Sequence, residues 1–287
     1  MARMFRRMVV AGVGLLGGSL ALAARRRGLV EEIIGYGRPG KNMRLAKSKR
    51  VIDDYFTNQA EFPQGTDLLI LATPVGALMP ISKAFLPRLE TQCVVSDVGS
   101  VKGKIVHDLD KLLAGRALFV GAHPIAGNEN WGARAAVSDL FDGRRCILTP
   151  TKKTDPKALE KMACFWRGVG AKVDFMDPDL HDKVLAVVSH LPHVAAYALV
   201  NTLGATKLDS VNLRDYCAGG FKDITRVASS RPEIWRDICI ANRDAVGKIL
   251  GDYIRRLERL KKWIDAGQAA SLEREFARAN EIRSGMA

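Results

Sequence analysis

Three glycines near the amino terminus restrict the fold of this 287-residue chain more than any other feature. They are Gly12, Gly14 and Gly17, and they follow the apolar segment 8–11 at the spacing G-x-G-x-x-G. In such a turn the first glycine permits a tight bend, the second lets a pyrophosphate approach the backbone, and the third lets a helix pack closely on the strand. The segment therefore predicts a strand, a turn that includes Leu15 and Leu16, and a helix whose amino end faces an anion.

The same region also allows a second interpretation. Arg3, Arg6 and Arg7 precede the uncharged run 8–24, and this order is typical of a secretory signal peptide. Three spaced glycines have no purpose in a secretory core, whereas each has a physical role in a dinucleotide-binding, or Rossmann, unit. We therefore predict a Rossmann unit in a cytoplasmic protein that is not attached to a membrane. The five scattered cysteines, with no C-x-x-C pair, are typical of reduced thiols and argue against a structural zinc site.

Short apolar runs alternate with helical patterns up to residue 176. Strands are predicted at 8–11, 32–36, 67–72, 93–98, 118–122, 146–148 and 172–175, and helices at 18–27, 41–49, 76–86, 101–113 and 156–169. This alternation predicts α/β crossovers and a mainly parallel sheet. The loops after the strands should meet at the carboxyl edge of the sheet, where such folds bind their ligands. The residues expected there include Thr73, Pro74, Asp97, Gly99 and His123.

Only helical patterns follow residue 177. A long helix is predicted at 179–203, and Pro192 inside it should bend the helix near His190 because proline removes a backbone donor. Further helices are predicted at 216–228, 232–265 and 268–282. The predicted fold class is therefore α/β: an N-terminal Rossmann-type dinucleotide-binding domain, residues 1–176, followed by an all-helical C-terminal domain, residues 177–287.

The chain is strongly basic, with 44 basic and 31 acidic residues and a net charge of +13. The basic residues are dispersed, and the aromatic residues, 7% of the chain, do not interleave with a basic stripe. This pattern argues against binding of nucleic acid and favours small anionic ligands drawn in by the general field. His190 and His193 are three residues apart, but no third ligand lies at metal spacing, so we expect no metal.

The end of the second predicted strand bears on the choice of cofactor. Folds of this kind that prefer NAD place a carboxylate about 20 residues after the glycines, where it binds the ribose 2′-hydroxyl. Here Gly37 stands at that position and Arg38 follows it, with Lys41 nearby. A guanidinium offers charge and paired hydrogen bonds to a 2′-phosphate. The sequence thus favours NADP, and NAD is the alternative if Arg38 is only a solvated loop residue.

Four further segments occur in a specific order and spacing. They are 97–102 (DVGSVK), 123–127 (HPIAG), 188–193 (VSHLPH) and 219–228 (GGFKDITRVA), the last followed by 232–237 (PEIWRD). Together they resemble the prephenate/arogenate (cyclohexadienyl) dehydrogenase family of tyrosine biosynthesis, and the similarity extends from residue 8 to the end of the chain. The resemblance implies oxidative decarboxylation of prephenate to 4-hydroxyphenylpyruvate. Hydride would pass to a nicotinamide cofactor while the ring carboxylate leaves as CO2.

The resemblance also implies two catalytic residues. His123 would accept the proton of the ring hydroxyl, a task that suits an imidazole because its ordinary pKa lies near neutral pH. Ser100 would hold that hydroxyl and His123 in register.

Residues that bind the dicarboxylate substrate are implied in the same way. Arg226 would grip a carboxylate through two parallel hydrogen bonds. The other implied substrate-site residues are His193, Gly219, Lys222 and Trp235. Family members often carry threonine and glutamate after the HPIAG segment, whereas this chain has Asn128 and Glu129, which puts the choice of substrate at this point in question.

Alternative functions remain open at this level. Arogenate differs from prephenate by an amino group in place of a keto group, and an acidic residue such as Glu129 could meet it. A β-hydroxyacid dehydrogenase would need a catalytic lysine, for which Lys183 is the nearby candidate, and a nucleotide-binding regulator would need no catalytic residues. The resemblance further implies a homodimer through the C-terminal helices. We expect no fused regulatory module, so any inhibition by tyrosine should act at the active site.

Overall fold

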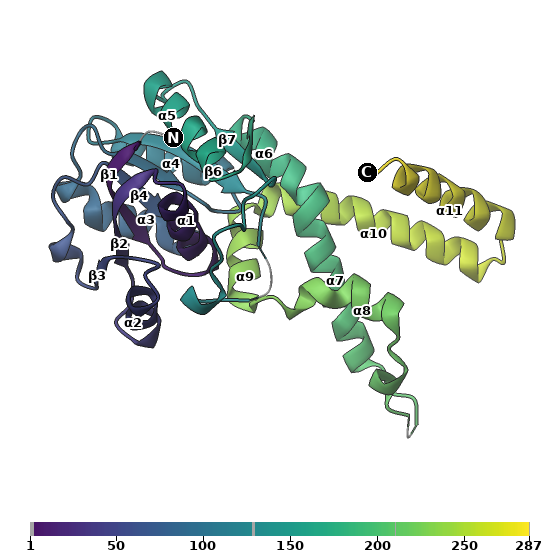
Figure 1. The fold of residues 1–287 in the computed structure, drawn as a ribbon. Helices are drawn as coiled ribbons and strands as arrows, with labels where there is room; N and C mark the ends of the chain where they lie inside the picture. Colours follow the sequence, from purple (N-terminus) through teal and green to yellow (C-terminus); the bar gives the residue numbers. More distant parts are fainter. Residues whose placement is uncertain (1–2, 128–129, 210, 287) are drawn as a thin grey trace. The chain divides into compact units, whose positions relative to one another are not determined.

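The computed structural model describes residues 3–127, 130–209 and 211–286 (Figure 1). The chain divides into two compact units, Met1–Asn242 and Arg243–Ala287. The first unit contains the sheet and the helices packed on it. The domain boundary predicted after residue 176 stays a proposal.

The first unit is built on one eight-stranded sheet with the order β3-β2-β1-β4-β5-β6-β7-β8 (Figure 1). All neighbouring strands are parallel except β6 and β7, which are antiparallel. This arrangement confirms the mainly parallel Rossmann-type sheet. The strands are β1 (Phe5–Ala11), β2 (Val30–Tyr36), β3 (Asp54–Phe56), β4 (Leu68–Leu71), β5 (Val94–Asp97), β6 (Leu118–Pro124), β7 (Arg145–Thr149) and β8 (Lys172–Phe175).

Helices cover both faces of the sheet, which explains why its central strands are continuous apolar runs. One buried cluster joins the sheet to α1, α2 and α5, and a second joins it to α3 and α4. The helices of these layers are α1 (Leu15–Arg26), α2 (Lys41–Ser48), α3 (Val75–Phe85), α4 (Gly103–Leu113) and α5 (Pro156–Gly168). Each predicted helix is present, with ends shifted by a few residues.

Strands β1, β3 and β6 differ from the sequence prediction, and β1 begins at Phe5 instead of residue 8. The edge strand β3 was not predicted, because its three residues, Asp54–Phe56, are too few to show a period. The strand predicted to end at residue 122 continues to Pro124, since β7 runs antiparallel beside it and pairs Ile147 with His123. His123 therefore lies within a strand and not in the loop that follows it.

The helical stretch after β8 is irregular where the proline predicts it. It consists of α6 (Pro178–Leu185), a π-helical turn (Ala186–His190) and α7 (Leu191–Ala205). Pro192 stands in the first turn of α7, where its missing N–H costs no bond within the helix. Among the described residues, Pro178–Ala205 alone is long and apolar enough to cross a membrane by length and composition. It also carries the buried residues His181, Asp182 and His190.

The segment predicted as one helix at 232–265 is two helices, α9 (Pro232–Ala241) and α10 (Arg243–Asp265). The break falls at Asn242, whose φ of −111° and ψ of 32° are not helical. The shorter α8 (Gly219–Thr225) precedes α9. In the second unit, α10 packs on α11 (Ala269–Ser284), and the Glu275 carboxylate of α11 lies 3.6 Å from the Arg259 guanidinium of α10.

Candidate active site

The glycine turn between β1 and α1 has the geometry that its spacing predicts. Gly12 adopts a φ of +99°, and a Cβ built there would lie 2.5 Å from the Ala72 carbonyl oxygen. A Cβ on Gly17 would lie 2.2 Å from the Gly12 carbonyl oxygen, so this glycine allows the helix to pack on the turn. At Gly14 no described atom lies within 4 Å of a built Cβ. The backbone at Gly14 is therefore open to an approaching group.

The amino end of α1 suits an anion. Its first turn begins at Leu15 and Leu16, with no side-chain cap and no acidic residue. Unpaired N–H groups and the helix dipole at such an end attract phosphate. Thr73 and the exposed Pro74 follow β4 beside Gly12, and the buried Thr73 Oγ1 has no hydrogen-bond partner among the described residues. The open Gly14 backbone and this orphaned hydroxyl fit a bound dinucleotide.

The end of β2 is basic, as its sequence predicts. Gly37 and Arg38 follow the last residue of the strand, and the Arg38 side chain is exposed and makes no ion pair with any described residue. A shallow hollow lies nearby between α2 and the segment 130–135, with Lys41, Trp131 and Arg134 in its lining. Arg38, Lys41 and Arg134 thus place positive charge near the carboxyl end of β2.

The turn after β5 is held by a buried ion pair. The Asp97 carboxylate accepts hydrogen bonds from the main-chain N–H groups of Gly99, at 2.8 Å, and Ala122, at 3.2 Å. It also pairs with the Lys102 ammonium, and both side chains are fully buried. The predicted contact of Asp97 with the cofactor stays a prediction. In the structure its carboxylate is held by these three groups and shapes the turn that presents Gly99 and Ser100.

A chain of polar side chains leads inward from His123. His123 Nδ1 lies 2.8 Å from His181 Nε2, and His181 Nδ1 lies 2.8 Å from the Asp182 carboxylate. That carboxylate also accepts the main-chain N–H groups of Lys102, at 2.7 Å, and Gly103, at 2.8 Å, where α4 begins. His123 is only 8% exposed and His181 is fully buried. The three residues join β6 to α6 and α4.

Burial keeps these imidazoles neutral. It lowers the pKa of His123 well below its ordinary value, and the charges of His181, Lys102 and His190 act in the same direction. The pKa of His181 is also lowered by burial, although the hydrogen bond to Asp182 opposes the change. A neutral imidazole has a free lone pair and can accept a proton, and the lowered pKa makes His123 a weaker base than a solvated imidazole.

A second polar group lies behind Ser100. The amide of Asn242 donates to His190 Nδ1 at 3.2 Å and to the main-chain oxygen of Asp182 at 2.8 Å. Burial lowers the pKa of His190 to about 4, and the Ser100 carbonyl faces the ring and opposes the change. Ser100 itself is half-buried, and no hydrogen bond joins its hydroxyl to His123 among the described residues. The predicted register between Ser100 and His123 is therefore not a direct bond.

The predicted substrate-binding residues gather around α7. The rings of His193 and Trp235 are stacked, with centroids 3.5 Å apart, and His193 Nδ1 lies 2.9 Å from the Ser189 carbonyl oxygen, to which it donates. Burial lowers the pKa of His193, and the nearby charge of Arg226 contributes to the change. Gly219 and Lys222 lie on the exposed α8, which precedes Arg226 directly. Asn128 and Glu129 lie outside the described residues.

The structure identifies four site residues that the sequence did not: Lys102, His181, Asp182 and Asn242. Each is buried although its side chain is polar, and each is bonded to another residue of the site. A histidine followed by an aspartate at the start of an apolar helix was the only signal for two of them. Lys183, the lysine that a β-hydroxyacid dehydrogenase would use, is exposed next to them.

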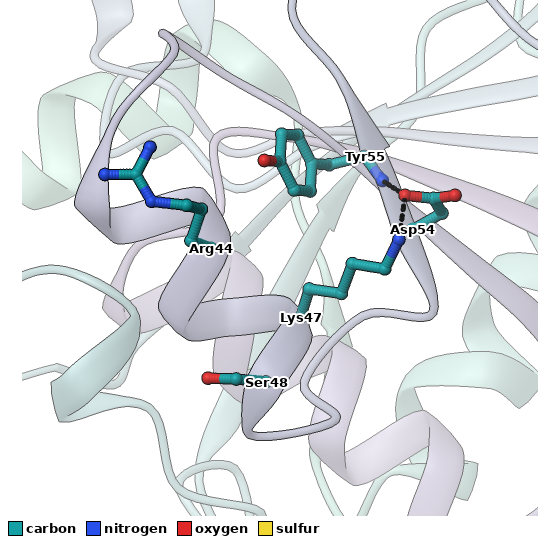
Figure 2. Close-up of a pocket in the computed structure, with 5 residues that line it drawn as sticks. All are labelled: Arg44, Lys47, Ser48, Asp54 and Tyr55. Carbon is teal, nitrogen blue, oxygen red and sulfur yellow. Dashed lines mark hydrogen bonds and ion pairs between the residues drawn. The ribbon is translucent and has the colours of Figure 1, made fainter.

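A further surface hollow lies apart from these residues. Figure 2 shows a shallow hollow between α2 and β3, where the Lys47 ammonium donates to the Asp54 carboxylate at 2.8 Å. Arg44 lines the hollow as well, and none of the predicted site residues lies in it. Within the described part of the chain, no group of three or more His, Cys, Asp or Glu side chains could hold a metal ion.

Comparisons with known proteins identify the family of this chain. Residues 20–175 match the family model described as prephenate dehydrogenase, nucleotide-binding domain, and residues 177–278 match that described as prephenate dehydrogenase, dimerization domain. The prephenate dehydrogenase of Bacillus subtilis is 35% identical over 97% of this chain and 76% of its own length. The cyclohexadienyl dehydrogenase of Zymomonas mobilis is 31% identical over 97% of this chain and 95% of its own.

One solved structure is similar to this protein over almost the full length of both chains. The prephenate dehydrogenase of Aquifex aeolicus, in complex with hydroxyphenyl propionate and NAD+, superposes with a TM-score of 0.93 at 39% identity and covers 98% of both chains. The glycine turn, the buried His123 and these matches along the chain lead to one conclusion. The chain belongs to the prephenate dehydrogenase family.

Proposed function

We propose that this protein catalyses the oxidative decarboxylation of prephenate to 4-hydroxyphenylpyruvate, with His123 as the general base. One observation carries the proposal. His123 is a nearly buried, neutral imidazole whose Nδ1 is hydrogen-bonded inside the protein, at 2.8 Å from His181, so that Nε2 is left for a ligand. A base of this kind speeds a proton transfer by roughly 10²–10⁴-fold.

In this mechanism His123 removes the proton of the ring hydroxyl through Nε2 as the carbon beneath it is oxidised. The substrate then loses its ring carboxylate as CO2, which makes the ring aromatic. Arg226 binds a carboxylate of the substrate, and the stacked pair of His193 and Trp235 forms an apolar wall beside it. Ser100 orients the hydroxyl from the turn that Asp97 and Lys102 hold rigid.

Cofactor binding belongs to the glycine turn. Gly12, Gly14 and Gly17, with the first turn of α1, would hold the pyrophosphate, and Thr73 and Pro74 would flank it. A nicotinamide nucleotide bound there supplies the acceptor for the hydride. We propose that NADP is preferred over NAD, because Gly37 stands where an NAD-preferring fold would place a carboxylate and the exposed Arg38 follows it. Lys41 adds to the positive charge on that side.

Arogenate is the second candidate substrate, since a relative of this chain is a cyclohexadienyl dehydrogenase. We favour prephenate because it is the substrate in the names of the relative that is 35% identical and of the solved structure that is 39% identical to this chain. We further propose a homodimer formed by the C-terminal helices, on which Ile254, Leu257 and Phe276 are exposed, and a cytoplasmic location.

The test is formation of reduced nicotinamide by the purified protein with prephenate or arogenate, each combined with NADP or NAD. The proposal predicts the highest kcat/KM with prephenate and NADP. A higher value with arogenate would overturn the choice of substrate, and a higher value with NAD would overturn the role of Arg38. Failure of all four combinations, in a protein that still binds a nucleotide, would contradict the proposed reaction.

A further inference from the structure

His123, His181 and Asp182 form a series of hydrogen bonds. The direction in which these bonds are donated decides which nitrogen of His123 can act as a base. We propose that His181 and Asp182 are positioning residues that keep the proton of neutral His123 on Nδ1 and leave Nε2 unprotonated. The catalytic meaning of this inference rests on the proposed function, because it assumes that His123 accepts a proton from the substrate.

Asp182 lies at the inner end of this series of hydrogen-bonded side chains. Its carboxylate accepts two main-chain N–H groups, from Lys102 and Gly103, in addition to its contact with His181. Both oxygens of Asp182 accept a main-chain N–H group at the amino end of α4, and a carboxylate only accepts hydrogen bonds. His181 Nδ1, at 2.8 Å, must therefore carry a proton and donate it to Asp182.

The next step concerns His181 itself. A neutral imidazole has one N–H group and one acceptor nitrogen. Burial lowers the pKa of His181, so the neutral form prevails, and a proton on Nδ1 leaves Nε2 as the acceptor. His123 Nδ1 lies 2.8 Å from that acceptor, so it must donate. Nε2 of His123 is then left with a lone pair.

The supporting groups are fixed by three separate elements. Asp182 is tied to the start of α4 through its carboxylate, and its main-chain oxygen accepts the Asn242 amide at 2.8 Å. His123 is held in β6 by its pairing with Ile147. When a proton reaches Nε2, the His123 imidazolium can still donate to His181, and the negative charge of Asp182 lies one ring further inward. The chain thus sets the tautomer before the reaction and stabilises the charge during it.

The tautomer can be measured without substrate. Nitrogen-15 NMR of the full-length protein labelled only at its five histidines reports whether each imidazole nitrogen carries a proton. We expect the His123 signals to be those of a protonated Nδ1 and an unprotonated Nε2, with a scalar coupling across the hydrogen bond between His123 Nδ1 and His181 Nε2. A protonated Nε2 on neutral His123, or absence of the coupling, would overturn the inference in the wild-type protein alone.

Two substitutions at one position separate positioning from packing. His181→Phe keeps a ring but removes the acceptor, so His123 should become a mixture of tautomers and kcat should fall by roughly 10²–10⁴-fold, the range of a general base. His181→Gln returns an acceptor near the position of Nε2. It should restore the single tautomer and most of kcat.

The controls distinguish this inference from the proposed function. If the wild-type protein shows the expected tautomer but turns over no cyclohexadienyl substrate, the proposed function fails and the positioning of His123 stands. If turnover is normal and His123 keeps one tautomer in His181→Phe, the positioning role fails and the function stands. The exposed His107 provides an internal reference whose signals should not change in either variant. An equal loss of kcat in both variants, with the tautomer unchanged, would indicate a packing role and refute the inference.

Discussion

Acid should destabilise this protein through its buried histidines, and His190 allows the size of the effect to be calculated. Burial lowers the pKa of His190 from 6.5 to about 4. The unfolded chain therefore takes up a proton near pH 6.5, while the folded protein does so only near pH 4. Between these values the unfolded state binds more protons, so the free energy of unfolding falls as the pH falls. Above pH 6.5 this contribution to stability is fully present.

The magnitude follows from the size of the shift. One pKa unit corresponds to 1.36 kcal/mol, so His190 alone should reduce the free energy of unfolding by about 3 kcal/mol between pH 7.5 and pH 4. This is a large part of the 5–15 kcal/mol that stabilises a typical domain. The pKa values of His123 and His181 are lowered as well, so the loss in the wild-type protein should exceed that of one histidine.

Urea unfolding at a series of pH values measures the effect, with His190→Asn as the perturbation. Asparagine can still accept the bond from Asn242 near the position of Nδ1, but it does not titrate. Above pH 6.5 the variant should be less stable than the wild-type protein by a constant amount, because a smaller side chain leaves a cavity. Between pH 6.5 and pH 4 the free energy of unfolding of the variant should fall less steeply than that of the wild-type protein. The reason is that unfolding of the variant takes up about one proton fewer. His107→Asn, at an exposed position, is the matched control. If His190→Asn and the wild-type protein have the same slope, the reasoning about burial is wrong.

Three further predictions concern binding. Gly14→Ala should weaken nucleotide binding at least tenfold in a fluorescence titration, because the added Cβ occupies the space that the pyrophosphate needs, and the Tm should stay unchanged. Gly17→Ala should instead lower the Tm, since its Cβ would clash with the turn. Arg38→Ala should raise KM for NADP by roughly tenfold and leave KM for NAD unchanged, and an equal change in both would contradict a contact with the 2′-phosphate. Arg226→Ala should raise KM for the dicarboxylate by an amount worth about 2–3 kcal/mol, for the loss of charge-assisted hydrogen bonds, and a lower Tm with KM unchanged would show a structural role.

The nucleotide-binding half of the fold is encoded by local sequence patterns, and for that reason its strands and helices could be predicted from the sequence. The glycines, the apolar strands and the helices between them each have a short-range pattern, and the structure shows the turn at Gly12, the close packing at Gly17 and the open backbone at Gly14. The edge strand β3 could not be predicted in this way, because three residues are too few to show a periodic pattern.

The inner part of the site depends on contacts that no local pattern contains. His123 and His181 are 58 residues apart, and the amides that bind Asp182 precede it by about 80. The extension of β6 through His123 depends on the antiparallel partner β7. Asn242 interrupts a pattern that is helical on both sides, and its amide bonds to Asp182 and His190 accompany the break. Polar residues buried by tertiary packing were thus the ones that sequence reasoning missed.

The central claim is that His123 is the base, and one substitution tests it directly. Asparagine at position 123 can still donate to His181 but has nothing in place of Nε2. Steady-state kinetics and nucleotide titration of His123→Asn should show kcat lowered by roughly 10²–10⁴-fold while the Kd of the cofactor is unchanged. A His123→Asn protein that turns over prephenate at the wild-type rate would contradict the account.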